Sequence, residues 1–229
     1  IRDSDSLDIN PKYKYFYDFL GHGLSGSVYG KRSFADEFNL KRFKLKKINV
    51  AFPNKASISS ARQFKNRNGS LGGNILKRFN MIIDYNKAII TLKKNGNFNA
   101  KFNYNRSGME LSHDGVRIVK QNKHNIIDRE PFDQSKSINV SRIYLNTGSN
   151  LITKPVYTIV ELRRGSPAEQ AGLEIGDIVL TINDKRTYNF TLQKITNFFY
   201  DDVGKKIKLK VDRNGKILNF NFRLEDVFK

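Results

Sequence analysis

The chain of 229 residues has no cysteine, and none of its apolar runs approaches the roughly 20 residues that span a bilayer. The lack of cysteine excludes disulfides, thiolate catalysis and cysteine-based zinc sites, although it does not distinguish the cytoplasm from an oxidising compartment. The three histidines, His22, His113 and His124, are scattered without the spacing of metal ligands. We therefore expect no metal site, no cofactor and no transmembrane segment in this chain.

Acidic residues are scarce, with 22 Asp and Glu against 41 Lys and Arg and a formal net charge of +19. Residues 1–106 hold 21 Lys and Arg against 7 Asp and Glu, a net of +14, whereas residues 107–229 hold 20 against 15, a net of +5. A basic excess favours anionic partners, but no aromatic-rich RNA motif or recognition helix accompanies it. We interpret the charge as solvated, Lys-rich strand faces and expect no nucleic-acid partner, which binding assays at low salt can test.

The second half of the chain begins with strand, helix and turn signals in quick succession. The segment 156–160 is β-branched and aromatic, as in a strand. Ser166 is a good N-cap and Pro167 suits the first position of a short helix, which Gly172 can end in a left-handed conformation. The apolar run 178–182 then predicts a further strand.

A second helix and a hairpin follow. Thr191 can cap a helix whose apolar residues share one face: Leu192, Ile195, Phe198 and Phe199. The segment 206–211 alternates lysine with Ile, Leu and Val, as a half-buried strand requires. Asn214-Gly215 is a strong two-residue hairpin signal, so the strand over 218–224 should return beside it.

Short motifs in this half resemble the central signature of PDZ domains, especially bacterial ones attached to proteases. They are Gly165-Ser166-Pro167-Ala168, Ala171-Gly172-Leu173, Gly176-Asp177 and Ile182-Asn183. These residues supply turns and close packing, so they mark the fold and not the site. The resemblance implies a PDZ domain over residues 107–229, a β sandwich or partly open barrel with two helices and an insertion at about 114–155.

In PDZ domains a peptide adds as a strand beside the second helix, and N–H groups of a glycine-containing loop hold its C-terminal carboxylate. By resemblance, the expected partners are extended peptides or protein C-termini. Glu110 would repel a carboxylate if it pointed inward, and Leu192 and Ile195 either line an apolar side-chain pocket or belong to the ordinary core. The residues that the resemblance assigns to peptide binding are Gly108, Met109, Glu110, Leu111, Leu192 and Ile195.

In the first half, the segment 21–28 fits the glycine loop G-x-G-x-x-G-x-V of protein kinases. A kinase also needs H-R-D and D-F-G motifs, which the sequence lacks, and a dinucleotide fold needs a helix where strand-like sequence follows. We reject both interpretations. Apolar residues over 38–50 predict short strands, Asn74 can cap a helix of one or two turns, and the segment 81–92 predicts a hairpin.

Residues 70–92 resemble the last part of retropepsin-like aspartic protease domains, in which a short helix behind the active site precedes a closing hairpin. In such a domain residues 21–30 would be the flap, a glycine-rich hairpin that closes over substrate. Its flap-like residues would be Gly21, Gly23, Leu24, Ser25 and Gly26. The resemblance implies a mainly β chain with short helices, in which an incomplete aspartic-protease-like β lobe over 1–106 precedes the PDZ domain.

Aspartic proteases use two aspartates that share a proton, each on an Asp-Thr/Ser-Gly loop. No such motif occurs here, so we assign no catalytic residue and expect that this chain alone does not cut peptides. By resemblance it is the C-terminal portion of an aspartic peptidase of the periplasm, cell envelope or exterior, although its first residues are not a secretory signal. The alternative is a non-catalytic PDZ scaffold, and no oligomeric state follows from the sequence.

Overall fold

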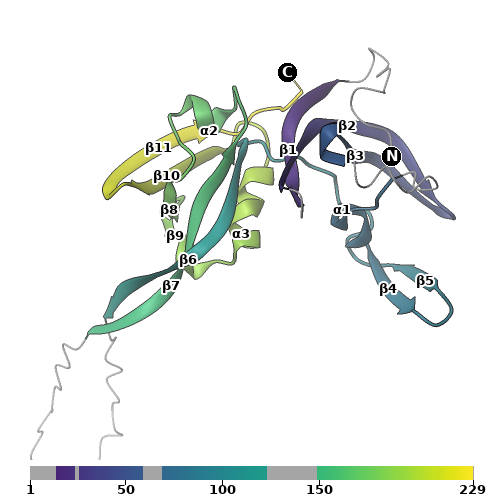
Figure 1. The fold of residues 1–229 in the computed structure, drawn as a ribbon, viewed down its shortest axis with the longest axis horizontal. Coiled ribbons are helices and arrows are strands. Elements are labelled where there is room, and N and C mark those ends of the chain that lie inside the picture. The colour runs from purple at the N-terminus through teal and green to yellow at the C-terminus, as the bar shows by residue number, and fades with distance from the viewer. Residues whose placement is uncertain (1–13, 24–25, 59–68, 123–148, 229) are drawn as a thin grey trace, which may run out of the picture.

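The computed structural model describes residues 14–23, 26–58, 69–122 and 149–228. As expected, these residues are mainly β with few, short helices, and their strands form three open antiparallel sheets. Figure 1 shows two parts, which we call the N-terminal lobe (residues 14–102) and the C-terminal domain (residues 107–228). The segment 103–106 joins them.

The N-terminal lobe is built on the strands β1 (Tyr15–Gly23), β2 (Gly26–Leu40) and β3 (Phe43–Pro53), paired in that order. The strands β2 and β3 are longer than the sequence predicted, because their ladder runs from the pair Gly30–Pro53 to the pair Leu40–Phe43. A single 3-10 turn, η1 (Ala56–Ile58), follows β3. The lobe's core is Phe43, Leu45, Ile48, Ile75 and Phe79.

The predicted short helix and hairpin both form, as α1 (Gly73–Leu76) followed by β4 (Phe79–Asp84) and β5 (Ile89–Lys94). The expected cap was wrong. Gly72, and not Asn74, is the N-cap, because its carbonyl already accepts the first helical hydrogen bond while its own backbone is extended.

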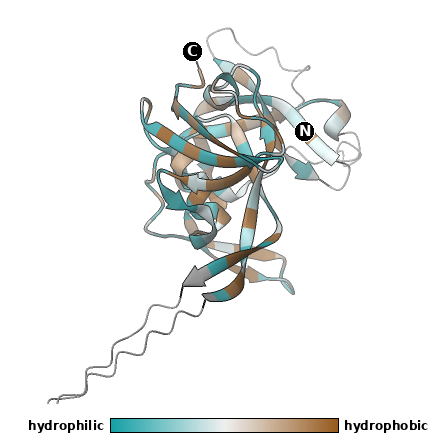
Figure 2. Ribbon diagram, turned by 90° about the vertical axis from the view of Figure 1, so that its left-hand side faces the viewer, coloured by the Kyte–Doolittle hydropathy of each residue, from teal (hydrophilic) through white to brown (hydrophobic). Residues whose placement is uncertain are grey.

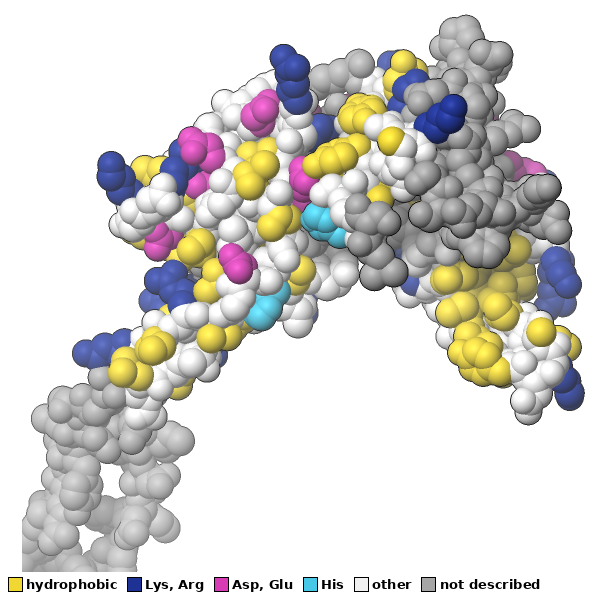
Figure 3. All heavy atoms as spheres, in the orientation of Figure 1, with side chains coloured by type: hydrophobic (Ala, Val, Ile, Leu, Met, Phe, Trp, Pro, Cys, Tyr) yellow, Lys and Arg dark blue, Asp and Glu magenta, His cyan; other side chains and the backbone are white. Residues whose placement is uncertain are grey.

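The hairpin of β4 and β5 exposes many large apolar side chains, which form a patch over these strands in Figure 3. They are Met81, Ile82, Ile83, Tyr85, Ile89 and Ile90. An isolated two-stranded hairpin is marginally stable in water. Its attachment to the lobe comes from Phe79, which is buried in the lobe's core, and from Leu92, which packs against it.

The C-terminal domain holds the larger sheet and most of the helices. Its strands are β6 (Met109–Asn122), β7 (Ser149–Leu162), β8 (Ile178–Ile182), β9 (Lys185–Arg186), β10 (Lys206–Arg213) and β11 (Lys216–Arg223). Its helical segments are α2 (Pro167–Gln170), η3 (Thr187–Asn189), α3 (Leu192–Asn197) and η4 (Phe198–Tyr200). The sheet order is β11-β10-β8-β7-β6, with β9 paired to β8.

The local signals of this domain are confirmed. The hydroxyl of Ser166 accepts from the N–H of Glu169 and caps α2, and the hydroxyl of Thr191 accepts from the N–H of Lys194 and caps α3. Asn214 and Gly215 both adopt left-handed conformations, with φ of 51° and 83°, as a two-residue hairpin turn requires. Figure 2 shows the alternation of apolar and polar residues that follows along the strands.

The segment 114–155, expected to be an insertion, is partly sheet. β6 continues to Asn122 and β7 begins at Ser149, and the two strands stay paired over this length. Within it, Asp114-Gly115 forms a bulge in β6, with φ of +69° at Gly115. The rest of the segment lies outside the described residues.

The joining segment and the C-terminal end of the described chain both contact the N-terminal lobe. Tyr104 is buried, and its hydroxyl donates to the carbonyl of Ser33 and accepts from the N–H of Val50. Phe228, at the end of the described chain, returns to stack edge-on against Phe16 of β1 and Tyr104. The C-terminal domain is therefore anchored to the lobe through both the joining segment and its own C-terminal end.

Candidate peptide-binding site

β6 is an edge strand: within the described residues it pairs with β7 on one side, and no strand lies on its other side. Ile159 of β7 donates its N–H to the carbonyl of Asp177 (2.9 Å) and accepts at its own carbonyl from Gly176 (2.8 Å). Its backbone therefore faces away from β6. Its register partner Leu111 must face the other way, toward the open edge, and so must His113 two residues on. These groups can pair with an added strand.

The helix α3 lies alongside β6, as Figure 1 shows. Of the two helix residues expected to contact peptide, Ile195 is fully buried in the domain core, and Leu192 is partly exposed and packs against that core. Leu192 is therefore the one that a ligand can reach without the core opening. We call Leu111–His113 of β6 together with α3 the β6–α3 edge.

A tight loop over residues 106–109 precedes this edge. Gly108 has φ of +78°, and a Cβ there would overlap the side chain of Ser166. The carbonyl of Ser107 accepts from Ala168 (3.1 Å), and that of Gly108 accepts from Arg163 (2.7 Å). With both carbonyls fixed against the domain, the N–H groups of Ser107 and Gly108 converge on the opposite side, in the arrangement of an anion-binding nest.

The acceptor at these N–H groups is the side chain of Asn105. Its Oδ1 lies 3.0 Å from the nitrogen of Ser107 and 3.2 Å from that of Gly108. Of the expected loop residues, Met109 is fully buried and Leu111 is 8% exposed, so both contribute side chains to the core. Gly108, one of the expected residues, supplies one of the converging N–H groups, and Ser107 at the start of the expected loop supplies the other.

Glu110 points toward the N-terminal lobe, where it helps to line a cavity of about 590 Å³ between the two parts. Asp18 of β1 pairs there with Arg32 (2.8 Å) and Arg163 (3.4 Å). Burial raises the pKa of Glu110, while a hydrogen bond from Asn105 opposes the rise. The cavity is thus a junction in which charges from both parts lie close together.

The glycine-rich hairpin expected as a flap is the turn between β1 and β2. Gly21, Gly23 and Gly26 belong to its strands, while Leu24 and Ser25 lie outside the described residues. Tyr29, on the same hairpin, donates its hydroxyl to Oε1 of Glu161 on β7 at 2.6 Å. The hairpin therefore contacts the C-terminal domain, although it does not reach the β6–α3 edge through this bond.

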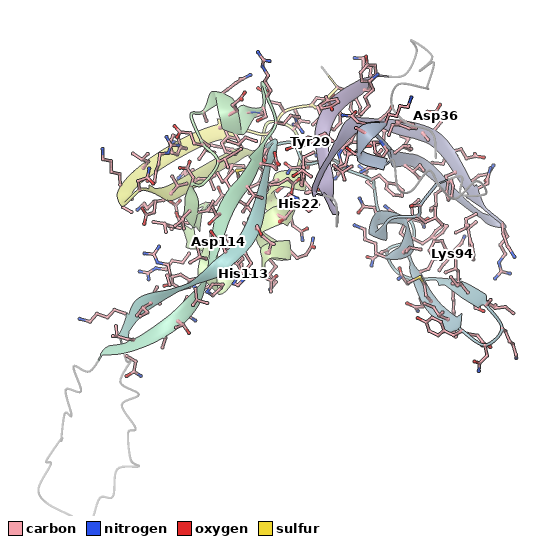
Figure 4. The ribbon with its side chains drawn as sticks, viewed as in Figure 1. His22, Tyr29, Asp36, Lys94, His113 and Asp114 are labelled. Atoms are coloured by element: carbon pink, nitrogen blue, oxygen red, sulfur yellow. The ribbon has the colours of Figure 1, made fainter. Side chains whose placement is uncertain are left out.

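The described histidines are held apart on different strands. Figure 4 places His22 on β1 and His113 on β6; His22 accepts or donates at the hydroxyl of Ser27, and His113 stacks against Tyr157. No group of three metal-ligating side chains occurs among the described residues. None of the helices in that part of the chain is long and apolar enough to cross a membrane.

An open strand edge beside a short helix, headed by a glycine loop with converging N–H groups, is the architecture of modules that bind peptides by strand addition. The PDZ domain family model matches residues 158–213. The C-terminal domain therefore contains a PDZ domain, as the sequence motifs predicted.

The chain is also homologous, over a limited region, to a protease. Eighty residues are 38% identical to the serine protease Do-like HtrA of Bacillus subtilis (strain 168), which is 34% of this chain and 17% of that protein. Structures of the HtrA-type protease AlgW with a decapeptide and with a tripeptide have TM-scores of 0.31 and 0.29, both at 11% identity. They cover 98% of this chain and 63% and 68% of theirs. At these TM-scores no shared fold follows.

The Bacillus subtilis relative is a serine protease, so it does not support the expected retropepsin-like aspartic lobe. The helix α1 and the hairpin after it do form, but a single helical turn before a hairpin is a local arrangement that many folds contain. The comparisons support a PDZ domain and a homology to a protease. They do not support an aspartic-protease-like lobe over residues 1–106.

Asn105 and Arg163 were not predicted as site residues from the sequence. An asparagine shortly before a glycine turn is a signal for side-chain capping of backbone N–H groups, so Asn105 could have been found. Arg163 could not, because its guanidinium contacts Asp18, which lies 145 positions earlier in the chain.

Proposed function

We propose that this chain is the peptide-binding part of a cell-envelope protease, in which the PDZ domain captures an extended polypeptide as an added strand on the β6–α3 edge. The observation that supports this most directly is the outward-facing backbone of Leu111 and His113 on a strand with one open side. Partly exposed Leu192 would contact an apolar side chain of the ligand. The N-terminal lobe would hold the edge in place relative to the rest of the protease.

The protease context is supported by the homology to a serine protease Do-like HtrA, and the envelope location by the resemblance of the PDZ motifs to bacterial ones attached to proteases. The match spans less than a fifth of that relative, so cleavage belongs to the proposal. Because this chain has no Asp-Thr/Ser-Gly motif, we expect the purified chain not to hydrolyse a quenched-fluorescent peptide library, with or without pepstatin. Pepstatin-sensitive cleavage would contradict this.

Binding can be tested by fluorescence anisotropy with labelled extended peptides. We expect Leu192→Lys to weaken binding at least about tenfold, because it places a charge against the apolar ligand side chain. Ile217→Lys is the matched control, since Ile217 is 53% exposed on β11 at the opposite edge of the same sheet. Equal affinities for the two variants, or no binding by the wild type, would contradict the proposed function.

A non-catalytic PDZ scaffold uses the same edge and predicts the same binding results. Cleavage assays on the full-length natural protein distinguish the two, because only a protease hydrolyses the peptide that the PDZ domain binds. A protease cleaves peptides that this edge captures, and Leu192→Lys then lowers kcat/KM for them, whereas a scaffold leaves them intact.

A further inference from the structure

The side chain of Asn105 uses both of its polar atoms at the head of the β6–α3 edge. Oδ1 accepts from the N–H of Ser107 (3.0 Å), the N–H of Gly108 (3.2 Å) and the hydroxyl of Ser107 (2.7 Å). Nδ2 donates to the carbonyl of Met109 (2.7 Å) and to Oε1 of Glu110 (3.2 Å). Asn105 is 5% exposed, so these bonds are made away from water.

This arrangement reproduces the end of an added strand. A peptide that ended here would place a carboxylate oxygen at the converging N–H groups of Ser107 and Gly108 and would donate its last N–H to a carbonyl of β6. Asn105 supplies an oxygen to the first position and an N–H to the second. The next N–H along, that of Met109, donates to the hydroxyl of Ser107 at 3.2 Å. The chain's own side chain therefore occupies the place of a peptide C-terminus.

The surroundings do not favour a carboxylate in place of this amide. The carboxyl group of Glu110 lies against Nδ2 of Asn105, so an arriving carboxylate would meet a second acidic group. Arg163 is close, but its guanidinium already donates to Asp18 and to the backbone carbonyl of Asn105, both at 3.4 Å.

The remainder of the edge is unaffected by Asn105. Leu111 and His113 still direct their backbone groups outward, up to the bulge at Asp114-Gly115. A strand can pair with these residues without presenting a terminal carboxylate. From this we infer, on the basis of the proposed function, that the PDZ domain selects the interior of an extended polypeptide over a C-terminal carboxylate. Asn105 is the residue that sets this specificity.

The test uses peptides of one sequence in three forms: the free acid, the C-terminal amide, and a version extended by a few glycine and serine residues. Anisotropy titrations of the full chain measure all three affinities. The wild type is expected to bind the amide and the extended peptide at least as tightly as the free acid. An acid that binds the wild type about tenfold more tightly than its amide would overturn the inference.

Two substitutions of Asn105 should affect the affinity for the free acid differently. Asn105→Ala vacates the N–H groups of Ser107 and Gly108, so the free acid should gain about tenfold in affinity relative to the amide. Asn105→Asp keeps an oxygen at those N–H groups and adds negative charge beside Glu110, so it should bind the acid no better than the wild type does. A gain for the acid in both variants, or in neither, would overturn the assignment of specificity to Asn105.

The inference can also be tested on the wild type by NMR, which does not depend on the variants folding. In the complex with the amidated peptide, the side-chain amide resonances of Asn105 should keep their free-state positions, while the backbone resonances of Leu111 and His113 shift. Large shifts at the Asn105 side chain with small ones at His113 would mean that the ligand displaces it, and would overturn the inference. If none of the three peptide forms binds, the proposed function fails and the inference with it; a preference for the acid removes the inference alone.

Discussion

Among the residues that the structure describes, each part fully buries one charged side chain, and the two parts provide its partners in different ways. In the N-terminal lobe Arg78 is 1% exposed and donates only to backbone carbonyls, those of Asn74, Asn97, Phe98 and Ala100. Its guanidinium carbon also lies 3.6 Å from the centre of the Phe102 ring. In the C-terminal domain Asp177 is 0% exposed and accepts two bonds from Arg213, at 2.6 and 2.8 Å.

The difference shows how each part is held together. Asp177 also accepts from the N–H of Glu174 and so closes the turn that precedes β8. Its bonds to Arg213 connect this turn to β10. Arg78 instead donates to one carbonyl of α1, that of Asn74, and to three carbonyls of the loop 97–100, so it ties this loop to the helix. Beside its hydrophobic core, the C-terminal domain thus has an ion pair within a local turn motif, whereas the lobe has a buried cation whose partners are backbone carbonyls.

The largest effect should come from removing that cation. Arg78→Ala removes the donor of four hydrogen bonds to backbone carbonyls and opens a cavity where the buried side chain was, so we expect a loss of about 3–5 kcal/mol in the free energy of unfolding. Urea denaturation monitored by circular dichroism measures it. Lys77→Ala, an exposed neighbour, is the control. Arg78→Lys should fall between them, because lysine keeps the charge but not the planar fork of donors. Wild-type stability for Arg78→Ala would refute the structural role of Arg78.

A smaller loss should follow from breaking the ion pair of the C-terminal domain. Asp177→Ala removes the buried partner of Arg213, but that arginine side chain is 22% exposed and can turn toward water. We expect about 2–3 kcal/mol, toward the low end for a disrupted buried pair. Lys208→Met breaks a surface pair with Asp184 in the same domain and should leave the unfolding midpoint unchanged. If Asp177→Ala costs more than Arg78→Ala, the contrast between the two parts is wrong.

The junction between the parts should respond more weakly still. Arg163→Met removes the contact with Asp18 and the stacking over Phe16, and keeps an apolar side chain of similar length. We expect a loss of about 1–2 kcal/mol, as for a partly buried charged hydrogen bond. Unfolding should also divide into two transitions, seen by fluorescence and by calorimetry, because the domains lose a link. The exposed pair Lys44–Glu37 supplies the control, since Lys44→Met should change neither quantity.

The two parts also differ in how much of their structure could be predicted from the sequence. Ser166, Thr191 and Asn214-Gly215 act on residues within a few positions of themselves, so their caps and turn were predicted correctly. The open edge of β6 was not, because strand order depends on pairing between distant segments. The sequence does not distinguish Arg78 from the many other basic residues of the lobe. Its role depends on the loop 97–100, whose carbonyls it binds only after the chain has folded.

The last prediction concerns Glu110, at the point where the two parts and the peptide edge meet. Burial raises the pKa of this carboxyl above its ordinary value of 4.5 in the folded chain. The folded state then holds the proton more tightly than the unfolded state, so Glu110 favours folding at pH below 4.5, and that contribution is lost as the pH rises through the raised pKa. Glu110→Gln keeps an acceptor for Asn105 and removes the titration.

The variant should therefore be more stable than the wild type at neutral pH, by about 1 kcal/mol, with the advantage shrinking toward acid pH. Unfolding by urea over a series of pH values measures it, and Glu225→Gln, a carboxyl at the rim of the same cavity, is the control. The opposite trend, a variant that loses stability relative to the wild type as the pH rises, would mean that Arg163 and Arg32 outweigh burial at Glu110. In that case the junction would be a favourable ion network across both parts, and a peptide carboxylate near Asn105 would meet a more positive field than the inference about specificity requires.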